Sequence, residues 1–379
     1  MKNLRIVLVT GNYNHIPDGV SLTLNRLVGY LESIGAKVLV VAPTIENPPI
    51  HHSGTLIPIK SISAPGRKEY RVSVGLGKVK KTILDFKPDL IHIATPDIAG
   101  FQALKLALKH QIPVVSSYHT HFSSYLEYYG LSLMEPLLWK YLKYFYSNSV
   151  HTYVPSQSMI DTLKQNGVKS DLRIWARGIE LDKFNPDKRD LAWRQEMGIK
   201  DDEILVTFVS RLVWEKEMDT LRSTFNALHN RDLKVKTMIV GDGPAGPELR
   251  ETMPDTIFTG YLKGEDLIRA YASSDVFMFP SISETFGNVT LEALACGIPA
   301  VVADAQGNKS LVVDGYNGFL VTPKDADAFT TKIMKIVNDS NLRIEMSKNA
   351  TEFAGKFTWD KIFKELIDNY AQAIKNYQK

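Results

Sequence analysis

The chain has 379 residues, of which 44% are hydrophobic and 23% are charged, and its formal net charge is +3. The composition is that of a globular protein, and the chain is long enough for two domains of ordinary size. The single cysteine, Cys296, excludes an internal disulfide and fits a small buried helix residue in a reducing compartment. No apolar run approaches the roughly 20 residues needed to span a bilayer. We therefore expect a cytoplasmic protein, with peripheral attachment to the inner face of the cell membrane as an open alternative.

The first half of the chain alternates strand-like and helix-like segments. Nearly unbroken apolar runs predict strands at Arg5–Thr10, Lys37–Ala42, Leu90–Ala94, Val114–Tyr118 and Thr152–Pro155. Helical segments are predicted between them at Ser21–Ile34, Val72–Phe86 and Ile98–Lys109. Such alternation indicates a parallel, doubly wound α/β sheet.

The pattern restarts after a linker-like segment at Arg177–Pro186. The second set of predicted strands is Ile204–Ser210, Val235–Val240, Thr256–Phe258, Val276–Pro280 and Ala300–Ala303. The helices predicted between and after them are Asp219–Leu228, Gly264–Ser273, Val289–Ala295 and Asp325–Val337. The last segment, Trp359–Tyr377, has the pattern of an amphipathic helix.

These two halves predict two Rossmann-like domains that face each other across a cleft. We expect residues 1–178 to form the N-terminal, acceptor-binding domain and residues 179–358 the C-terminal, donor-binding domain. The last helix, residues 359–379, is expected to pack back on the first domain. Ligands of such sheets bind beyond the carboxyl ends of the strands, so the motifs that follow strands should converge there.

Two motifs of the first half follow predicted strands. Gly19 and Val20 would present backbone N–H groups at a helix's amino end, which suits phosphate, although a glycine that merely fits a tight turn explains the pattern equally well. His119 and His121 follow the strand ending at Tyr118. Because no third and fourth ligand is found at suitable spacing, we expect no metal here. A role in binding or orienting a substrate is the preferred interpretation for His119.

The second half carries two cations after its first strand. Arg211 and Lys216 lie five positions apart and combine a planar fork with a compact point charge, which suits a diphosphate. An ordinary surface pair with Glu215 and Glu217 is the alternative. After the next strand, Gly241-Asp242-Gly243-Pro244 would let the backbone approach a nucleotide closely.

The segment Ser283–Glu292 holds two carboxylates, Glu284 and Glu292, around a Phe286-Gly287-Asn288 turn. It lies between a predicted strand and a predicted helix, so Glu284 should follow the strand and Glu292 should lie in the first turns of the helix. Helix amino ends carry free N–H groups and partial positive charge. Such a loop could hold a sugar's hydroxyls, its phosphates and a ribose together.

Taken together, these motifs make the chain resemble the retaining glycosyltransferase family 4, with the GT-B fold, over essentially its whole length. The order and spacing of Glu284-x7-Glu292, Arg211-x4-Lys216, the Gly241 turn and the His119 segment carry the resemblance. Val313–Leu320 is similar to that family's late turn-and-strand segment. The resemblance implies a hexosyltransferase that uses a nucleotide-diphosphate sugar and no other cofactor.

The resemblance also implies roles for individual residues. The catalytic set would be Arg211 and Lys216 on the diphosphate, Glu284 on the donor-sugar hydroxyls and His119 on the sugar's opposite side. The remaining donor contacts would come from Gly19, Gly241, Phe286, Gly287, Asn288 and Glu292, with Glu292 on the ribose. Acceptor binding would involve Asp18 and His121, where a related subgroup commonly carries aspartate in place of His121.

That subgroup contains GDP-mannose-dependent α-mannosyltransferases and the sulfoquinovosyl- and glucuronosyl-diacylglycerol synthases. GDP-mannose is the preferred donor, with UDP-linked glucose, glucuronate or sulfoquinovose as the alternative. The acceptor would be a hydroxyl, for which a glycolipid or diacylglycerol is one candidate.

Charge distribution bears on a lipid acceptor. Residues 1–180 carry a net charge of +8 and the remainder −5. The aromatic segment Phe122–Tyr146, interrupted by Lys140 and Lys143, and a basic stretch around Lys80 and Lys81 would suit an anionic membrane surface. Aromatics packed in the first domain's core are the alternative.

Three other functions stay open at this point. A GT-B-fold epimerase or a phosphorylase is an alternative enzyme, although no motif for a pyridoxal-phosphate lysine is apparent. A catalytically silent nucleotide-sugar-binding protein is the non-enzymatic alternative. Nucleic-acid binding is not expected, because no recognition motif accompanies the basic half.

Overall fold

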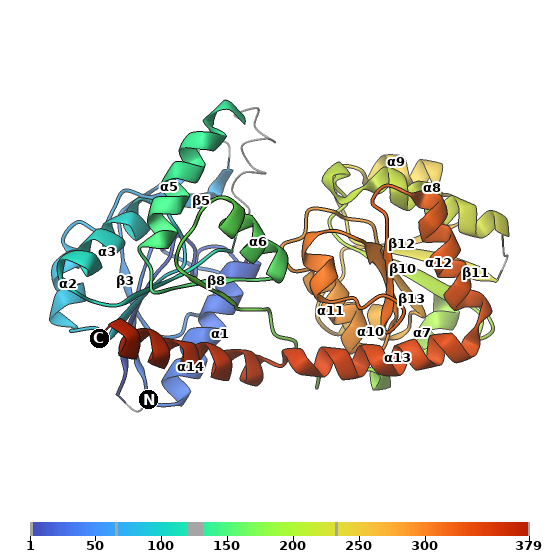
Figure 1. Ribbon diagram of the computed structural model, residues 1–379. Coiled ribbons are helices and arrows are strands. Elements are labelled where there is room, and N and C mark those ends of the chain that lie inside the picture. The colour runs from blue at the N-terminus through green and yellow to red at the C-terminus, as the bar shows by residue number, and fades with distance from the viewer. Residues whose placement is uncertain (1–2, 65–66, 120–131, 232–233, 378–379) are drawn as a thin grey trace. The chain divides into compact units, whose positions relative to one another are not determined.

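The computed structural model describes residues 3–64, 67–119, 132–231 and 234–377. The chain divides into two compact units. Unit 1 contains Met1–Trp175 and Phe363–Lys379, and unit 2 contains Ala176–Ile362. Unit 1 is therefore built from the beginning and the end of the chain, drawn in blue to green and in red in Figure 1.

In the described part of unit 1, seven strands form a parallel sheet in the order β3-β2-β1-β6-β7-β8-β9. These strands are β1 (Arg5–Val9), β2 (Lys37–Ala42), β3 (Thr55–Pro58), β6 (Leu90–Ile93), β7 (Val114–Ser117), β8 (His151–Val154) and β9 (Asp171–Ile174). The helices are α1 (Gly19–Ser33), α2 (Val79–Asp85), α3 (Ile98–Lys109), α5 (Glu135–Ser147), α6 (Gln157–Gln165) and most of α14 (Trp359–Tyr377). The central strands β6, β7 and β8 are buried throughout, so both faces of the sheet are covered. They nevertheless carry buried polar residues, among them His92, Ser117 and His151.

One predicted helix of unit 1 is partly wrong. We expected a helix over Val72–Phe86, but Val72 belongs to β5 (Arg67–Ser73), which pairs antiparallel with β4 (Ser61–Ala64). Helix α2 begins only at Val79. Gly75 and Gly77 have φ values of +109° and +51°, which a helix cannot contain, and they separate the hairpin from the helix.

The C-terminal helix α14 is anchored in unit 1 by aromatic residues. Figure 1 shows α14 (red) beside α1 (blue), and the rings of Tyr30 and Phe363 lie 5.4 Å apart. Tyr370 is fully buried, and its hydroxyl lies 2.6 Å from His92 Nδ1. Burial lowers the pKa of His92 to about 3, so this histidine is neutral at ordinary pH. A neutral histidine can hold the helix without the cost of burying a charge.

In the described part of unit 2, six strands form a parallel sheet in the order β12-β11-β10-β13-β14-β15. They are β10 (Ile204–Val209), β11 (Val235–Val240), β12 (Thr256–Gly260), β13 (Val276–Phe279), β14 (Ala300–Ala303) and β15 (Gly318–Val321). The helices are α7 (Leu191–Glu196), α8 (Met218–Arg231), α9 (Gly246–Thr252), α10 (Gly264–Ala272), α11 (Asn288–Ala295), α12 (Ala326–Asn338) and α13 (Ser340–Ala354). The two parallel sheets confirm the predicted pair of Rossmann-like folds. Within the described ranges, no helix is both long and apolar enough to cross a membrane.

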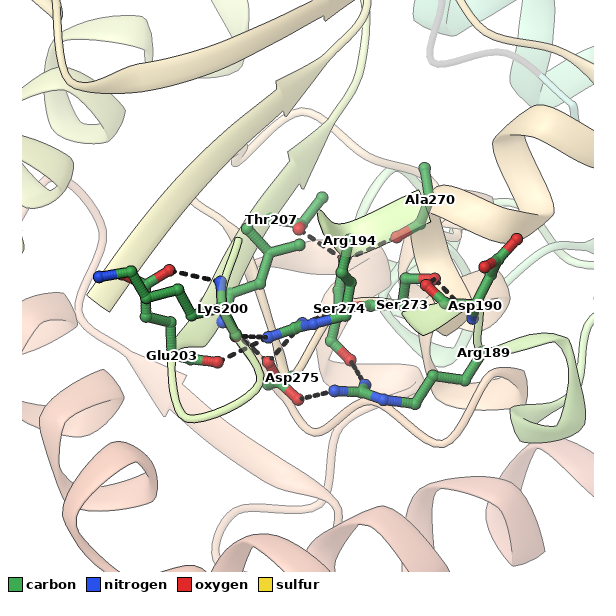
Figure 2. Close-up of polar contacts among 11 residues, drawn as sticks. Arg189, Asp190, Arg194, Lys200, Glu203, Thr207, Ala270, Ser273, Ser274 and Asp275 are labelled. Atoms are coloured by element: carbon green, nitrogen blue, oxygen red, sulfur yellow. Dashed lines mark hydrogen bonds and ion pairs between the residues drawn. The ribbon is translucent and has the colours of Figure 1, made fainter. Parts of the chain in front are cut away.

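A polar cluster joins the amino ends of β10 and β13 in unit 2 (Figure 2). The Asp275 carboxylate precedes β13 and accepts a hydrogen bond from the Leu205 backbone N–H of β10 at 2.8 Å. Arg194 of α7 donates to the same carboxylate oxygen at 3.0 Å, and Arg189 donates to the other at 2.8 Å. Asp275 therefore ties two adjacent strands to the segment that leads into the sheet.

Arg194 is fully buried, which is rare for arginine. Its guanidinium also donates to the carbonyls of Ser273 at 2.7 Å and Glu203 at 2.6 Å. Figure 2 shows Arg194 between these groups. The burial is tolerable because the charge has a carboxylate partner and several carbonyl acceptors.

We predict that Arg194→Ala destabilises the protein strongly, because it leaves the Asp275 carboxylate without its buried partner. The free energy of unfolding, measured by urea titration with tryptophan fluorescence, should fall by about 3–5 kcal/mol. Arg222→Ala is the control, since Arg222 pairs with the exposed Asp219 and Glu248, and it should cost less than about 1 kcal/mol. Equal effects of the two substitutions would contradict a structural role for the cluster.

Candidate active site

The order of strands in unit 2 predicts where a ligand binds. From β10 the chain moves to β11 and β12 on one side, and then returns to β13 on the other side of β10. The loops after β10 and β13 therefore leave adjacent strands in opposite directions, which is the position where open α/β sheets bind ligands. The first of these loops carries Arg211 and Lys216, and the second carries Glu284.

The structure brings Lys216 and Glu284 into direct contact. Lys216 ends a short 3₁₀ turn, Trp214–Lys216, and its ammonium pairs with Glu284 Oε1. The same ammonium donates to Ser283 Oγ at 3.3 Å. The side chains of Lys216 and Glu284 are only 13% and 23% exposed, so water screens this ion pair weakly.

Arg211 occupies the same loop but is much more exposed. Its guanidinium is 3.7 Å from Glu215 Oε1, and the two side chains are 72% and 48% exposed. Such a surface pair holds its members weakly. The surface pairing that the sequence left open therefore exists, and Arg211 remains free to reorient toward a ligand at little cost.

The loop that carries Glu284 is held by two hydrogen bonds from the 3₁₀ segment Gln306–Ser310, one from its backbone and one from a side chain. Gly307 N donates to the Glu284 carbonyl at 2.9 Å, and Asn308 Nδ2 donates to the Ser281 carbonyl at 3.0 Å. A Cβ atom on Gly307 would lie 2.4 Å from Phe286 N, so a side chain there would push the loop away. Gly307 and Asn308 therefore position the loop. Neither residue was predicted from the sequence. The signal that could have indicated them is a glycine in a short polar run directly after β14.

The turn Phe286-Gly287-Asn288 begins helix α11. Gly287 has a φ of +94°, which favours glycine, and Asn288 is exposed at the first helical position. Phe286 is buried, with its ring 5.9 Å from that of Phe357. As expected, the first carboxylate follows a strand and the second lies in the helix that this turn starts.

Glu292 lies in α11 beside α10. Burial raises its pKa to about 7, and the nearby Tyr271 hydroxyl partly offsets this rise. Cys296, at the end of the same helix, is buried as expected. Among the described residues, Glu292 makes no hydrogen bond or ion pair with Lys216 or Glu284. Its carboxyl is therefore a polar group of unit 2 that is separate from the Lys216–Glu284 pair.

The Gly241 turn follows β11, next to β10. Gly241 has a φ of +140°, and a Cβ there would lie 1.9 Å from the Ser210 carbonyl oxygen. The Gly241 N–H donates to the Gly260 carbonyl at 2.8 Å. The glycine is therefore required by the close packing of three strand ends, independently of any ligand.

Four of the predicted site residues belong to unit 1: Asp18, Gly19, His119 and His121. Asp18 caps α1, since its Oδ1 accepts from Ser21 N at 2.7 Å and its Oδ2 accepts from Asn12 Nδ2 at 3.0 Å. Gly19 is exposed at the first residue of that helix. The His119 ring packs edge-on against Trp175 at 5.3 Å. His121 lies outside the described residues.

The described residues contain no evident metal site. In those ranges, no group of three or more histidine, cysteine, aspartate or glutamate side chains is arranged to hold an ion. Two positive charges come from the loop after β10, on Lys216 and Arg211.

The raised pKa of Glu292 predicts a pH-dependent stability difference. The unfolded carboxyl titrates near 4.5 and the folded one near 7, so the folded state holds the proton more tightly between these values. The free energy of unfolding therefore falls as pH rises through this range. Because glutamine resembles the protonated acid, Glu292→Gln should raise the melting temperature more at pH 8 than at pH 5, relative to wild type.

The control for this measurement is Glu345→Gln, which changes an exposed glutamate of α13. Its melting temperature relative to wild type should not differ between the two pH values. An equal shift at pH 5 and pH 8 for Glu292→Gln would show that burial does not penalise the ionised carboxylate.

The comparisons with known proteins agree with this arrangement. A family model for "Glycosyltransferase Family 4" matches residues 17–183, and one for "Glycosyl transferases group 1" matches residues 190–353. The chain is 30% identical to a GDP-mannose-dependent alpha-mannosyltransferase of Corynebacterium glutamicum, with 100% of this chain and 91% of the relative aligned. It is 32% identical to the sulfoquinovosyl transferase SQD2 of Arabidopsis thaliana, with 96% and 72% aligned. It is also 30% identical to an alpha-monoglucosyldiacylglycerol synthase of Streptococcus pneumoniae, with 81% and 72% aligned.

Solved structures support the fold. The sucrose-phosphate synthase of Thermosynechococcus elongatus superimposes with a TM-score of 0.77 at 21% identity, covering 99% of this chain and 100% of that chain. The Anabaena protein HepE, solved with UDP, gives a TM-score of 0.77 at 20% identity, with 98% and 100% covered. The chain therefore belongs to glycosyltransferase family 4 and is a hexosyltransferase with the GT-B fold.

Proposed function

We propose that this enzyme transfers a hexose from a nucleoside-diphosphate sugar to an acceptor hydroxyl with retention of configuration, and that GDP-mannose is its donor. The observation that carries the proposal is the contact between Lys216 and Glu284 where the loops after β10 and β13 meet. A cation for the diphosphate and a carboxylate for sugar hydroxyls are then adjacent, at the place where such sheets bind ligands.

The chemistry follows from where charge develops. Breaking the anomeric C–O bond leaves positive charge on the sugar and negative charge on the departing diphosphate. Lys216 and Arg211 would stabilise that diphosphate in the transition state, and in this proposal they need no metal ion. Lys216 is held in place by Glu284 and Ser283, whereas Arg211 would have to leave Glu215.

The proposed route to retention is attack on the same face of the sugar that the diphosphate leaves. The departing phosphate would accept the proton of the acceptor hydroxyl. Glu284, already paired with Lys216, would bind sugar hydroxyls rather than act as a nucleophile. Trapping of a covalent glycosyl-enzyme on any side chain would contradict this route.

The names of two relatives support GDP-mannose as the donor. The Corynebacterium glutamicum and Mycolicibacterium smegmatis relatives are both named GDP-mannose-dependent alpha-mannosyltransferases, and they align with 100% and 98% of this chain. The names of the sulfoquinovosyl transferase and the monoglucosyldiacylglycerol synthase point to other transferred sugars, sulfoquinovose and glucose. The alternative donor is therefore a UDP-linked glucose, glucuronate or sulfoquinovose. In both cases Glu292 would contact the ribose and Gly241 would border the nucleotide.

We predict that GDP-mannose raises the melting temperature of the enzyme, because a ligand that binds the folded state stabilises it. With acceptor present, GDP release should be measurable, and Lys216→Ala should lower kcat/KM by about 10²–10³-fold. Lys324→Ala is the control, because Lys324 is 66% exposed and makes only a distant pair with Glu217 at 3.8 Å. Its activity should be close to that of wild type.

The outcomes separate the alternatives. Stabilisation by a UDP-sugar alone would favour the alternative, a transferase that depends on a UDP-sugar. Binding without release of nucleoside diphosphate, with any acceptor tested, would favour a silent binding protein. No stabilisation by any GDP or UDP species would refute the assignment of the site.

We also propose that the acceptor is a lipid at an anionic membrane surface. Two relatives named alpha-monoglucosyldiacylglycerol synthase, from Streptococcus pneumoniae and Acholeplasma laidlawii, support this acceptor class. The face of α5 adds a physical argument, since Leu133 just before it and Leu137 within it are 99% and 65% exposed. Lys140 and Tyr144 continue the same face at helical spacing, and both are exposed. Exposed leucine beside lysine is the pattern of a helix that lies in a membrane interface.

We predict that the protein sediments with vesicles containing anionic phospholipid at low salt, and that the double substitution Leu133→Ser and Leu137→Ser reduces the bound fraction severalfold. Ile344→Ser is the control, because Ile344 is 67% exposed but lies on α13 of unit 2. Sedimentation should be unchanged in this variant. Absence of vesicle binding by wild type, or equal loss in both variants, would remove the membrane proposal.

A further inference from the structure

The ion pair between Lys216 and Glu284 sets up a competition within the proposed donor site. Lys216 is the best-shielded cation of the two that the site offers, and its ammonium is engaged by Glu284 and by Ser283 Oγ. A diphosphate that binds Lys216 must therefore share or take over a cation that already has a carboxylate partner. Weak screening by water makes this exchange energetically significant.

The donor, a nucleoside-diphosphate sugar, and the product, a nucleoside diphosphate, should differ in how well they compete with Glu284 for Lys216. A nucleoside-diphosphate sugar carries hydroxyls that can donate hydrogen bonds to the Glu284 carboxylate. The carboxylate then keeps partners when Lys216 turns toward the diphosphate. The product nucleoside diphosphate lacks the transferred hexose, so it would leave Glu284 with a weakened partner and bring phosphate charge close to a carboxylate.

We propose that Glu284 drives release of the nucleoside diphosphate by reclaiming Lys216 once the sugar has been transferred. This inference rests on the proposed function, because it requires that Lys216 binds the diphosphate. It assigns Glu284 a second role beyond contact with the sugar: it weakens binding of the product relative to the donor. The paired arrangement in the structure is the state to which the site returns.

The test is calorimetric titration of Glu284→Gln with GDP and with GDP-mannose, or with UDP and UDP-glucose if wild type binds those instead. Glutamine keeps the size of the side chain and removes its charge. Because Glu284→Gln removes the charged partner that competes for Lys216, the diphosphate should bind this variant about tenfold tighter than wild type. The nucleotide sugar should bind no tighter, because the variant loses a charged acceptor for the sugar hydroxyls.

A double-mutant cycle with Lys216→Met separates this mechanism from a general change in charge. If Glu284 acts by competing for Lys216, then Glu284→Gln should give no gain in diphosphate affinity when Lys216 is already methionine. A gain of the same size in that background would overturn the proposal, since it would arise from simple repulsion. Glu215→Gln removes an equal charge beside Arg211 at an exposed position, and it should change diphosphate affinity less than twofold.

The failure of this inference can be told apart from failure of the proposed function. If wild type binds the diphosphate and Lys216→Met weakens binding, the function stands. Equal or weaker diphosphate binding by Glu284→Gln would then overturn the competition alone. Melting curves of each variant establish that it is folded, and Glu284→Asp provides a second variant that retains the charge and should keep the wild-type preference for nucleotide sugar.

Discussion

The adjacency of strands β10 and β13 is the constraint on which unit 2 depends. At their amino ends, the Asp275 carboxylate accepts from the backbone of β10 and is held by Arg194 and Arg189. At their carboxyl ends, the loop after β10 carries Lys216 and the loop after β13 carries Glu284, and these two side chains form an ion pair. One pair of parallel strands thus has a buried structural ion pair at one end and the proposed donor site at the other.

The loops of the candidate site are positioned by hydrogen bonds to their backbone carbonyls and by close packing at a glycine. Gly307 and Asn308 bind the carbonyls of Glu284 and Ser281, and Gly241 fits against Ser210 with no room for a side chain. These contacts fix the loops from behind, so the charged side chains can exchange partners without loss of the loop geometry. A site that must bind a donor and then release a shorter product benefits from this division between a rigid backbone and exchangeable charges.

Much of the fold could be predicted from the sequence, because many buried parallel strands are nearly continuous apolar runs, as in β1 and β13. The antiparallel hairpin β4–β5 could not, since Arg67–Ser73 carries several charged residues and lacks an apolar run. Its end was therefore assigned to the helix that starts only after Gly75 and Gly77. Arg194 was also missed, because a charged residue in a helix is ordinarily solvent-exposed and its partner Asp275 is distant in sequence.

The candidate site was predictable in part for a different reason. The rule that ligands bind beyond strand carboxyl ends places Lys216 and Glu284 at one edge of the sheet, and the family resemblance supplied their proposed roles. Their direct pairing could not be predicted, because they lie in loops 68 residues apart and no periodicity relates them. The same holds for the raised pKa of Glu292, which comes from burial between α10 and α11.

The most direct test is which group Lys216 contacts when a nucleotide sugar is bound. A crystal structure of the enzyme with GDP-mannose or a non-transferable analogue measures this directly. The account predicts the diphosphate within hydrogen-bond distance of Lys216 Nζ and sugar hydroxyls on the Glu284 carboxylate. A nucleotide bound elsewhere in unit 2, with Lys216 and Glu284 still paired to each other alone, would contradict it.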